Sequence, residues 1–163
     1  MGMNFLNRLY RFAGYSSLGL LAAIGVLGLL AIVPTIATDL ATSFSEYQGD
    51  QVLITLLLGT PVAVFVIILI EVAYLLWLVN NDRILSPRVF KWVRLLSLSS
   101  FALALSLLAI GLWLTAKNTL PPAVLFVLTA LILLAAAVGF VTRSLQGLLK
   151  KATDAAADLE GVI

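Results

Sequence analysis

Residues 52–79 have the sequence VLITLLLGTPVAVFVIILIEVAYLLWLV, an apolar stretch in which Glu71 is the only charged side chain. About 20 helical residues cross the hydrocarbon core of a bilayer, which is about 30 Å thick. Three further stretches are long and apolar enough to do the same, namely residues 16–37, 95–116 and 121–142. The runs are continuously apolar rather than alternating, which excludes a membrane β-barrel. The sequence therefore predicts an all-α integral membrane protein with four transmembrane helices.

The composition of the chain supports this class. Of its 163 residues, 62% are hydrophobic and 11% are charged, and the mean hydropathy is +1.12. A soluble domain carries about 25% charged residues, and a small fold can bury only part of its apolar surface. The excess apolar side chains must face lipid, and we expect residues 1–163 to form a single membrane domain.

The first apolar stretch follows Arg8 and Arg11, as the apolar part of a signal peptide would. A signal peptide has an apolar core of roughly 7–15 residues and then a small-residue cleavage site. The stretch 16–37 is longer and lacks a clear site of this kind. We therefore expect an uncleaved helix.

The distribution of basic residues predicts the orientation. Nine of the ten Lys and Arg residues lie in the N-terminal segment, in the loop after the second apolar stretch or in the tail 143–163. Only Lys117 lies in a connection on the other side, and the loop 38–51 has no basic residue. Short basic segments stay in the cytoplasm. We expect an up-down bundle with both termini cytoplasmic.

The two ends of the chain are amphipathic. Residues 3–13 place polar and apolar side chains on opposite faces, which predicts a helix lying on the inner leaflet. The cytoplasmic tail 143–163 has the same character and is expected to be helical. It either extends the fourth helix or folds back along the membrane.

The connections indicate where helices begin and which of them pair. The turn at residues 117–120 is so short that the third and fourth helices must be antiparallel neighbours. Ser86 and Pro87 suit the N-cap and first position of the third helix, and Pro121 and Pro122 suit the first turn of the fourth.

Glu71 is the first candidate functional residue. It lies about 13 Å along the helix from Asn80, at a rise of 1.5 Å per residue. A charge at the bilayer centre costs about 2.5–3.5 kcal/mol on insertion scales, so such a residue faces a partner or a wet cavity. One interpretation makes it a proton, cation or subunit contact. The alternative is a structural carboxyl bonded to Tyr74, a nearby serine or a backbone carbonyl, or a carboxylate paired with Arg83 or Arg94.

Small residues are the second group of candidates. Gly19 and Ala23 in the first helix, and Ala135 and Gly139 in the fourth, have the spacing that lets transmembrane helices approach closely. They are either internal contacts or a surface for another subunit. The third helix carries Ser97, Ser99, Ser100 and Ser106. We expect these serines to pack and hydrogen-bond between helices of the chain; the alternative is that they line a polar channel.

Arg88, Lys91 and Arg94 form a basic strip at the start of the third helix. Such a strip fixes topology and attracts anionic lipid, at about 1 kcal/mol per residue near the surface. A docking surface for a cytosolic protein is the alternative.

Catalytic chemistry has few candidates in this chain. Cysteine and histidine are absent, which removes thiolate metal sites, the usual haem ligand and the commonest general base. The sequence has no phosphate-binding glycine loop and no metal-ligand spacing. We expect no enzyme activity, no cofactor, no metal and no nucleic-acid partner.

Two segments carry a resemblance to a known family. Residues 80–94 have the sequence NNDRILSPRVFKWVR, and residues 148–163 have the sequence LLKKATDAAADLEGVI. On these segments the chain resembles small bacterial four-helix membrane proteins described only as a domain of unknown function (DUF2975). Asp82 and Leu85 depart from the glycine and phenylalanine associated with that loop. The resemblance implies a fold and a topology over nearly the whole chain, and a place in a bacterial inner membrane, but no activity.

Three functions remain open. The preferred hypothesis is an accessory or regulatory membrane protein that contacts other membrane proteins or forms a homo-oligomer, surrounded by the lipid bilayer. The alternative is a small oligomeric transport or proton-conducting protein that uses Glu71. A lipid- or cofactor-binding module is the third, because pigments and quinones can bind in apolar grooves without histidine.

Overall fold

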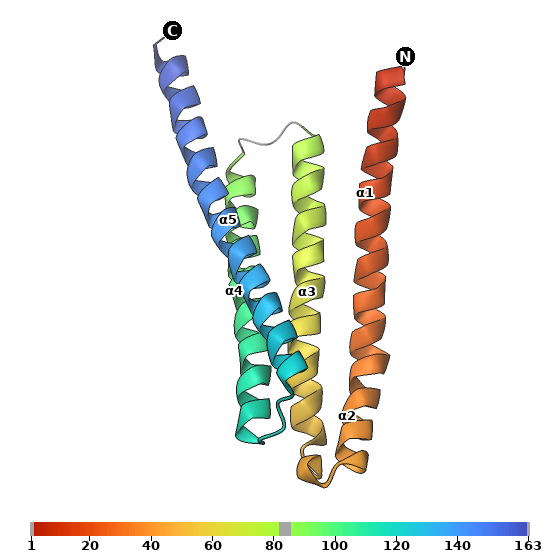
Figure 1. Ribbon diagram of the computed structural model, residues 1–163. Coiled ribbons are helices and arrows are strands. Elements are labelled where there is room, and N and C mark those ends of the chain that lie inside the picture. The colour runs from red at the N-terminus through yellow and green to blue at the C-terminus, as the bar shows by residue number, and fades with distance from the viewer. Residues whose placement is uncertain (1, 82–85, 163) are drawn as a thin grey trace. The chain divides into compact units, whose positions relative to one another are not determined.

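The computed structural model describes residues 2–81 and 86–162 (Figure 1). Arg83, Asp82 and Leu85 lie outside the described residues. The elements are α1 (Gly2–Leu27), the π-helical turn η1 (Gly28–Ile32), α2 (Val33–Ser43), the 3₁₀ turn η2 (Ser45–Tyr47), α3 (Gln51–Asn80), α4 (Pro87–Ala116) and α5 (Pro122–Gly161). The chain divides into two compact units, residues 1–73 and 74–163, with the boundary inside α3.

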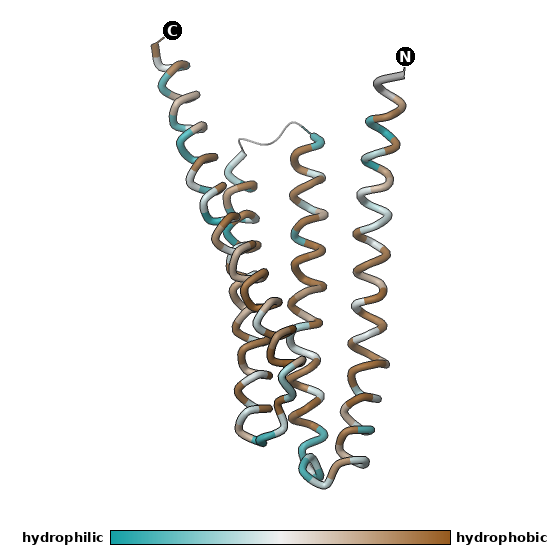
Figure 2. The backbone as a smooth tube through the Cα atoms, viewed as in Figure 1, coloured by the Kyte–Doolittle hydropathy of each residue, from teal (hydrophilic) through white to brown (hydrophobic). Residues whose placement is uncertain are grey.

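The prediction of four membrane-spanning helices is confirmed. The described residues contain four helical stretches long and apolar enough to cross a bilayer: Phe5–Ser43, Gln51–Asn80, Pro87–Ala116 and Pro122–Gly161. Each predicted stretch lies within one of them, apart from Pro121, which immediately precedes α5. Figure 2 shows hydrophobic residues along the middle of the helices and hydrophilic residues gathered in the C-terminal part of α5. The helices are longer than the bilayer requires.

The first long helix contains a π-helical turn directly before a proline. The amide of Val33 donates to the carbonyl of Gly28, five residues back, and Pro34 then stands at the start of α2. Proline has no amide hydrogen and its ring collides with the carbonyl four residues earlier. A wider turn at this point accommodates the ring without ending the helix.

The N-terminal segment does not form a separate helix on the membrane surface. Residues 3–13 belong to α1, which runs unbroken from Gly2 to Leu27. The prediction of a helix lying on the leaflet is therefore wrong. The amphipathic pattern was identified correctly, but no residue between 13 and 16 breaks the helix and allows the chain to turn.

In the first unit, α1 and α2 run antiparallel to the first part of α3. A Cβ added at Gly25 would lie 2.6 Å from Cγ2 of Val66, so the two helices approach closely there. The amide Nε2 of Gln51 donates to Oγ1 of Thr38 at 2.8 Å, near the connecting turn. Val33, Ala37 and Ile54 are buried in this unit.

In the second unit, α4 and α5 pack side by side as an antiparallel hairpin, as predicted (Figure 1). Asn118 ends α4 in the left-handed conformation, with φ of 56°. Its amide donates to the carbonyl of Thr115, and the amide of Thr119 donates to that of Leu114 at 3.1 Å. These bonds form a Schellman motif, which satisfies the last carbonyls of the helix.

The predicted starts of α4 and α5 are confirmed. Ser86 is the N-cap of α4 in extended conformation, and Pro87 follows as its first residue. Pro121 is the N-cap of α5, and Pro122 is its first residue. The amides that proline lacks are among those left unbonded at any helix start, so the prolines cost nothing here.

The tail extends the fourth helix. α5 continues without a break from Pro122 to Gly161, which is about 60 Å at 1.5 Å per residue. Of the two arrangements that the sequence left open for residues 143–163, the structure has the continuous helix.

Candidate functional site

Glu71 lies within α3 and is buried, with 4% of its surface exposed. A carboxyl inside a membrane-spanning helix can hold a proton or accept hydrogen bonds from a partner. This burial fits a carboxyl that holds a proton or serves structure within the chain, whereas a contact with another subunit would need an exposed side chain. Glu71 belongs to the first unit and Tyr74 to the second, because the boundary lies between residues 73 and 74.

Tyr74 belongs to an aromatic cluster with Trp77 and Trp92. Its ring centroid lies 4.4 Å from that of Trp92 at the start of α4, and 5.7 Å from that of Trp77 on its own helix. Tyr74 and Trp92 pack against a small core formed by Leu78, Val89 and Val93, as does Leu149 of α5. The end of α3, the start of α4 and the middle of α5 therefore meet in this cluster.

Ala135 and Gly139 are internal contacts of the α4–α5 hairpin. Both are buried, and the hydroxyl of Ser97 donates to the carbonyl of Gly139 at 3.0 Å. A Cβ added at Gly139 would lie 3.0–3.2 Å from the ring of Phe101. The Phe101 ring also makes an edge contact with Phe140, with centroids 5.1 Å apart.

The hydroxyls of Ser97, Ser100 and Ser106 on α4 all donate to backbone carbonyls within the hairpin. Ser97 and Ser100 are among the most deeply buried side chains. The hydroxyls of Ser100 and Ser106 donate to carbonyls of their own helix, at Leu96 and Leu103. This pattern agrees with the expectation of helix packing.

Gly19 and Ala23 lie on the exposed side of α1, unlike the pair on α5. A Cβ added at Gly19 would meet nothing within 4 Å, and both residues are exposed. The small residue that brings α1 against α3 is Gly25, which the spacing rule did not select. Ala22, three residues earlier on the same side of α1, is a small residue that could have indicated this side from the sequence.

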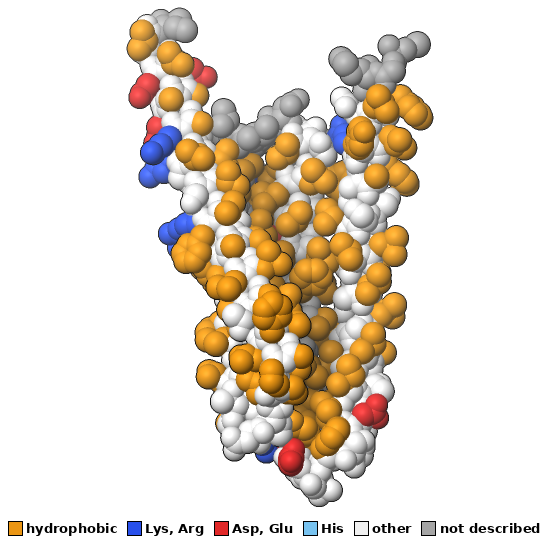
Figure 3. Space-filling view, viewed as in Figure 1, with side chains coloured by type: hydrophobic (Ala, Val, Ile, Leu, Met, Phe, Trp, Pro, Cys, Tyr) orange, Lys and Arg blue, Asp and Glu red, His pale blue; other side chains and the backbone are white. Residues whose placement is uncertain are grey.

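The basic strip is exposed along α4. Arg88, Lys91 and Arg94 are all exposed, while Val89 and Val93 between them are buried. Figure 3 shows that Lys and Arg side chains also gather over one stretch of α5, with Asp and Glu side chains beyond them toward the C-terminus. The strip is therefore available to a ligand or to the membrane surface.

Comparisons with known proteins give a family and no activity. No curated protein and no solved structure matches the chain. A family model described as "protein of unknown function (DUF2975)" matches residues 35–163, which include most of α2 and all of α3, α4 and α5. The resemblance found on the loop and the tail is thus confirmed, and the chain belongs to the DUF2975 family of proteins of unknown function.

Proposed function

We propose that this protein is a non-enzymatic accessory or regulatory subunit of a membrane assembly, and that it acts through helix–helix contacts. Its partner is another membrane protein or a further copy of the same chain. The helices carry a bilayer-facing apolar surface, and one face of α1 has the pattern of a helix-pairing seam.

That face of α1 is the observation that carries the proposal. Phe12, Ser16, Gly19, Ala23 and Val26 follow one another at alternating spacings of four and three residues, and all five are exposed. A repeat of 3.5 residues keeps one stripe turned toward a partner helix. The small residues in the middle of the stripe permit a close approach, which drives helix association in lipid.

The other side of α1 is occupied within the chain. Gly25 lies against Val66 of α3, and the side chain of Leu29 lies 3.4 Å from a Cβ added at Gly59. One side of α1 therefore contacts α3, and the stripe from Phe12 to Val26 is exposed. An open seam of this kind supports a partner from another chain.

We further place both termini in the cytoplasm of a bacterial inner membrane, with the four helices in an up-down bundle. Support comes from the nine of ten basic residues that lie near the termini, between α3 and α4 or in the first turns of α4. Short basic segments are retained in the cytoplasm.

The experiment is extraction from native membranes in mild detergent, followed by native-gel separation and mass spectrometry. We expect a stoichiometric partner to co-migrate with the wild-type protein. The double variant Gly19→Ile and Ala23→Ile should lose that partner, because two branched side chains hold the helices apart. The matched control, Ala102→Ile with Ala109→Ile on the exposed side of α4, should keep it. A lone species of 17.4 kDa plus detergent would overturn the proposal.

A second candidate function, proton or ion conduction, is favoured by the burial of Glu71 inside α3. Under this hypothesis Glu71→Gln abolishes flux in proteoliposomes, because the amide cannot take up and release a proton. The control is Glu46→Gln, which lies in the turn η2 outside the long helices. Flux that persists unchanged in the Glu71 variant would make the carboxyl structural.

A further inference from the structure

We propose that the α4–α5 hairpin binds the headgroup of an anionic phospholipid on one face. This basic face consists of Lys91 and Arg94 on α4 and Arg143 and Lys150 on α5, all four exposed. It extends the strip seen in the sequence to a second helix and leaves Arg88 out.

The register of the hairpin brings these residues to one level. The hydrogen bond from Ser97 to the carbonyl of Gly139 sets the two helices opposite each other at this point. Arg94 lies three residues before Ser97, and Arg143 lies four residues after Gly139. At 1.5 Å per residue these are displacements of roughly 4.5 and 6 Å in the same direction, because the helices are antiparallel. Arg94 and Arg143 are therefore nearly level on neighbouring helices.

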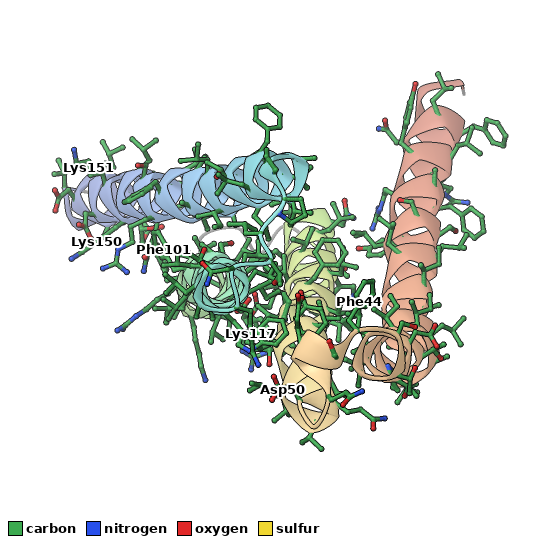
Figure 4. The ribbon with its side chains drawn as sticks, turned by 60° about the horizontal axis from the view of Figure 1, so that its bottom comes forward. Phe44, Asp50, Phe101, Lys117, Lys150 and Lys151 are labelled. Carbon is green, nitrogen blue, oxygen red and sulfur yellow. The ribbon has the colours of Figure 1, made fainter. Side chains whose placement is uncertain are left out.

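The helical repeat brings the four residues to one side. With Ser97 and Gly139 facing each other and 3.6 residues per turn, Lys91 and Arg94 project to the same side of the hairpin as Arg143 and Lys150. Arg88 projects directly away from α5, whereas Lys151 is turned to the same side as these four residues but outward from α4. Figure 4 shows Lys150 on the side of α5 toward α4 and Lys151 on the opposite side.

Four like charges on one face repel one another and attract a counter-anion. The structure gives none of these side chains an ion pair within its described residues. The acidic side chains of the tail begin at Asp154, one turn beyond Lys150 and farther from the apolar part of the hairpin. An anion from outside the chain, bound at the level of Arg94 and Arg143, would balance the positive charge of this face.

The surface below the charges indicates that this anion carries acyl chains. Leu98 and Leu105 are exposed on the same side of α4 as Arg94, about 6 and 16 Å deeper along the helix. Leu105, the deeper of the two, therefore lies about the thickness of one leaflet of the hydrocarbon core below Arg94. Phe101, which packs on Gly139, lies between Leu98 and Leu105 along α4; Figure 4 shows its side chain on α4. A basic end that continues into an apolar stripe fits a phospholipid better than a soluble partner.

The test compares two pairs of charge-removing substitutions in the full-length protein. Arg94→Gln with Arg143→Gln changes the basic face, whereas Arg11→Gln with Arg88→Gln removes the same charge from exposed residues outside this face. Each purified protein is offered phosphatidylglycerol and phosphatidylcholine in equal amounts, and retained lipid is counted by native mass spectrometry. We expect wild type and the control pair to retain phosphatidylglycerol preferentially. The test pair should lose this preference roughly tenfold or more.

Further measurements separate the proposal from its rivals. Arg94→Lys with Arg143→Lys keeps both charges and should keep the preference, with an unchanged helical circular dichroism spectrum in all variants. Equal losses in the test and control pairs would overturn the proposal, because general charge would then explain binding. Displacement of the lipid by millimolar inorganic phosphate would also overturn it. Loss of a co-purifying soluble protein from the test pair, with lipid retention unchanged, would assign the face to a protein partner instead.

Discussion

Gly139 and Gly147 lie about two turns apart on α5 and meet different surroundings. A Cβ at position 139 would press on the ring of Phe101, whereas a Cβ at position 147 would meet nothing within 4 Å. We expect Gly139→Ala to lower the free energy of unfolding by about 1–2 kcal/mol through overpacking. Gly147→Ala should leave it unchanged or raise it by up to about 1 kcal/mol, because alanine favours the helix.

Thermal unfolding in one detergent measures this difference. For a chain of this size, 1 kcal/mol shifts Tm by about 2–4 °C. Equal Tm values for the two alanine variants would contradict the close contact at Gly139.

Residue identity alone could not separate the two small-residue pairs. Gly19 with Ala23 and Ala135 with Gly139 have the same spacing and the same permissive chemistry, yet the first pair is exposed and the second is buried. Small side chains allow close approach from any neighbour, so their pattern indicates a contact without saying to which helix. That Glu71 would not face lipid was easier to predict, because an exposed charge inside a span is costly.

At the scale of the element, Asn118 decides how α4 ends. Its φ of 56° lies in the left-handed region, which costs a β-branched residue about 1–2 kcal/mol. We expect Asn118→Ile to destabilise the α4–α5 hairpin by this amount and Asn118→Gly to be tolerated. Urea or thermal unfolding of both variants checks the prediction, and an isoleucine variant as stable as the glycine variant would contradict it.

The four long helices and the starts of α4 and α5 could be predicted, but the full lengths of α1 and α5 could not. Hydropathy detects the part of a helix that lies in the hydrocarbon core, and the polar continuation of α5 has no such signal. The continuation has two physical causes. Alanine-rich residues 152–157 favour the helix, and the stripe Gln146, Leu149 and Thr153 stays partly buried as the helix continues. The π-helical turn before Pro34 was likewise hidden, because proline alone also permits a kink or a break.

At the scale of the whole molecule, the orientation can be tested because the chain has no cysteine. We introduce a single cysteine by Ser45→Cys in η2 or by Ala157→Cys in the tail of α5, both at exposed positions. In intact cells a membrane-impermeant maleimide should label position 45 and reach position 157 only after permeabilisation. The opposite labelling pattern would contradict cytoplasmic termini and the basic-residue rule on which they rest.

The most direct test of a helix-contact function is photocrosslinking in native membranes. A photoreactive aliphatic residue replaces Val26 on the open seam of α1 or, as control, Leu112 on the exposed side of α4. The account predicts that position 26 yields an adduct containing a second polypeptide, while position 112 yields lipid adducts alone. Lipid adducts alone at both positions would contradict it.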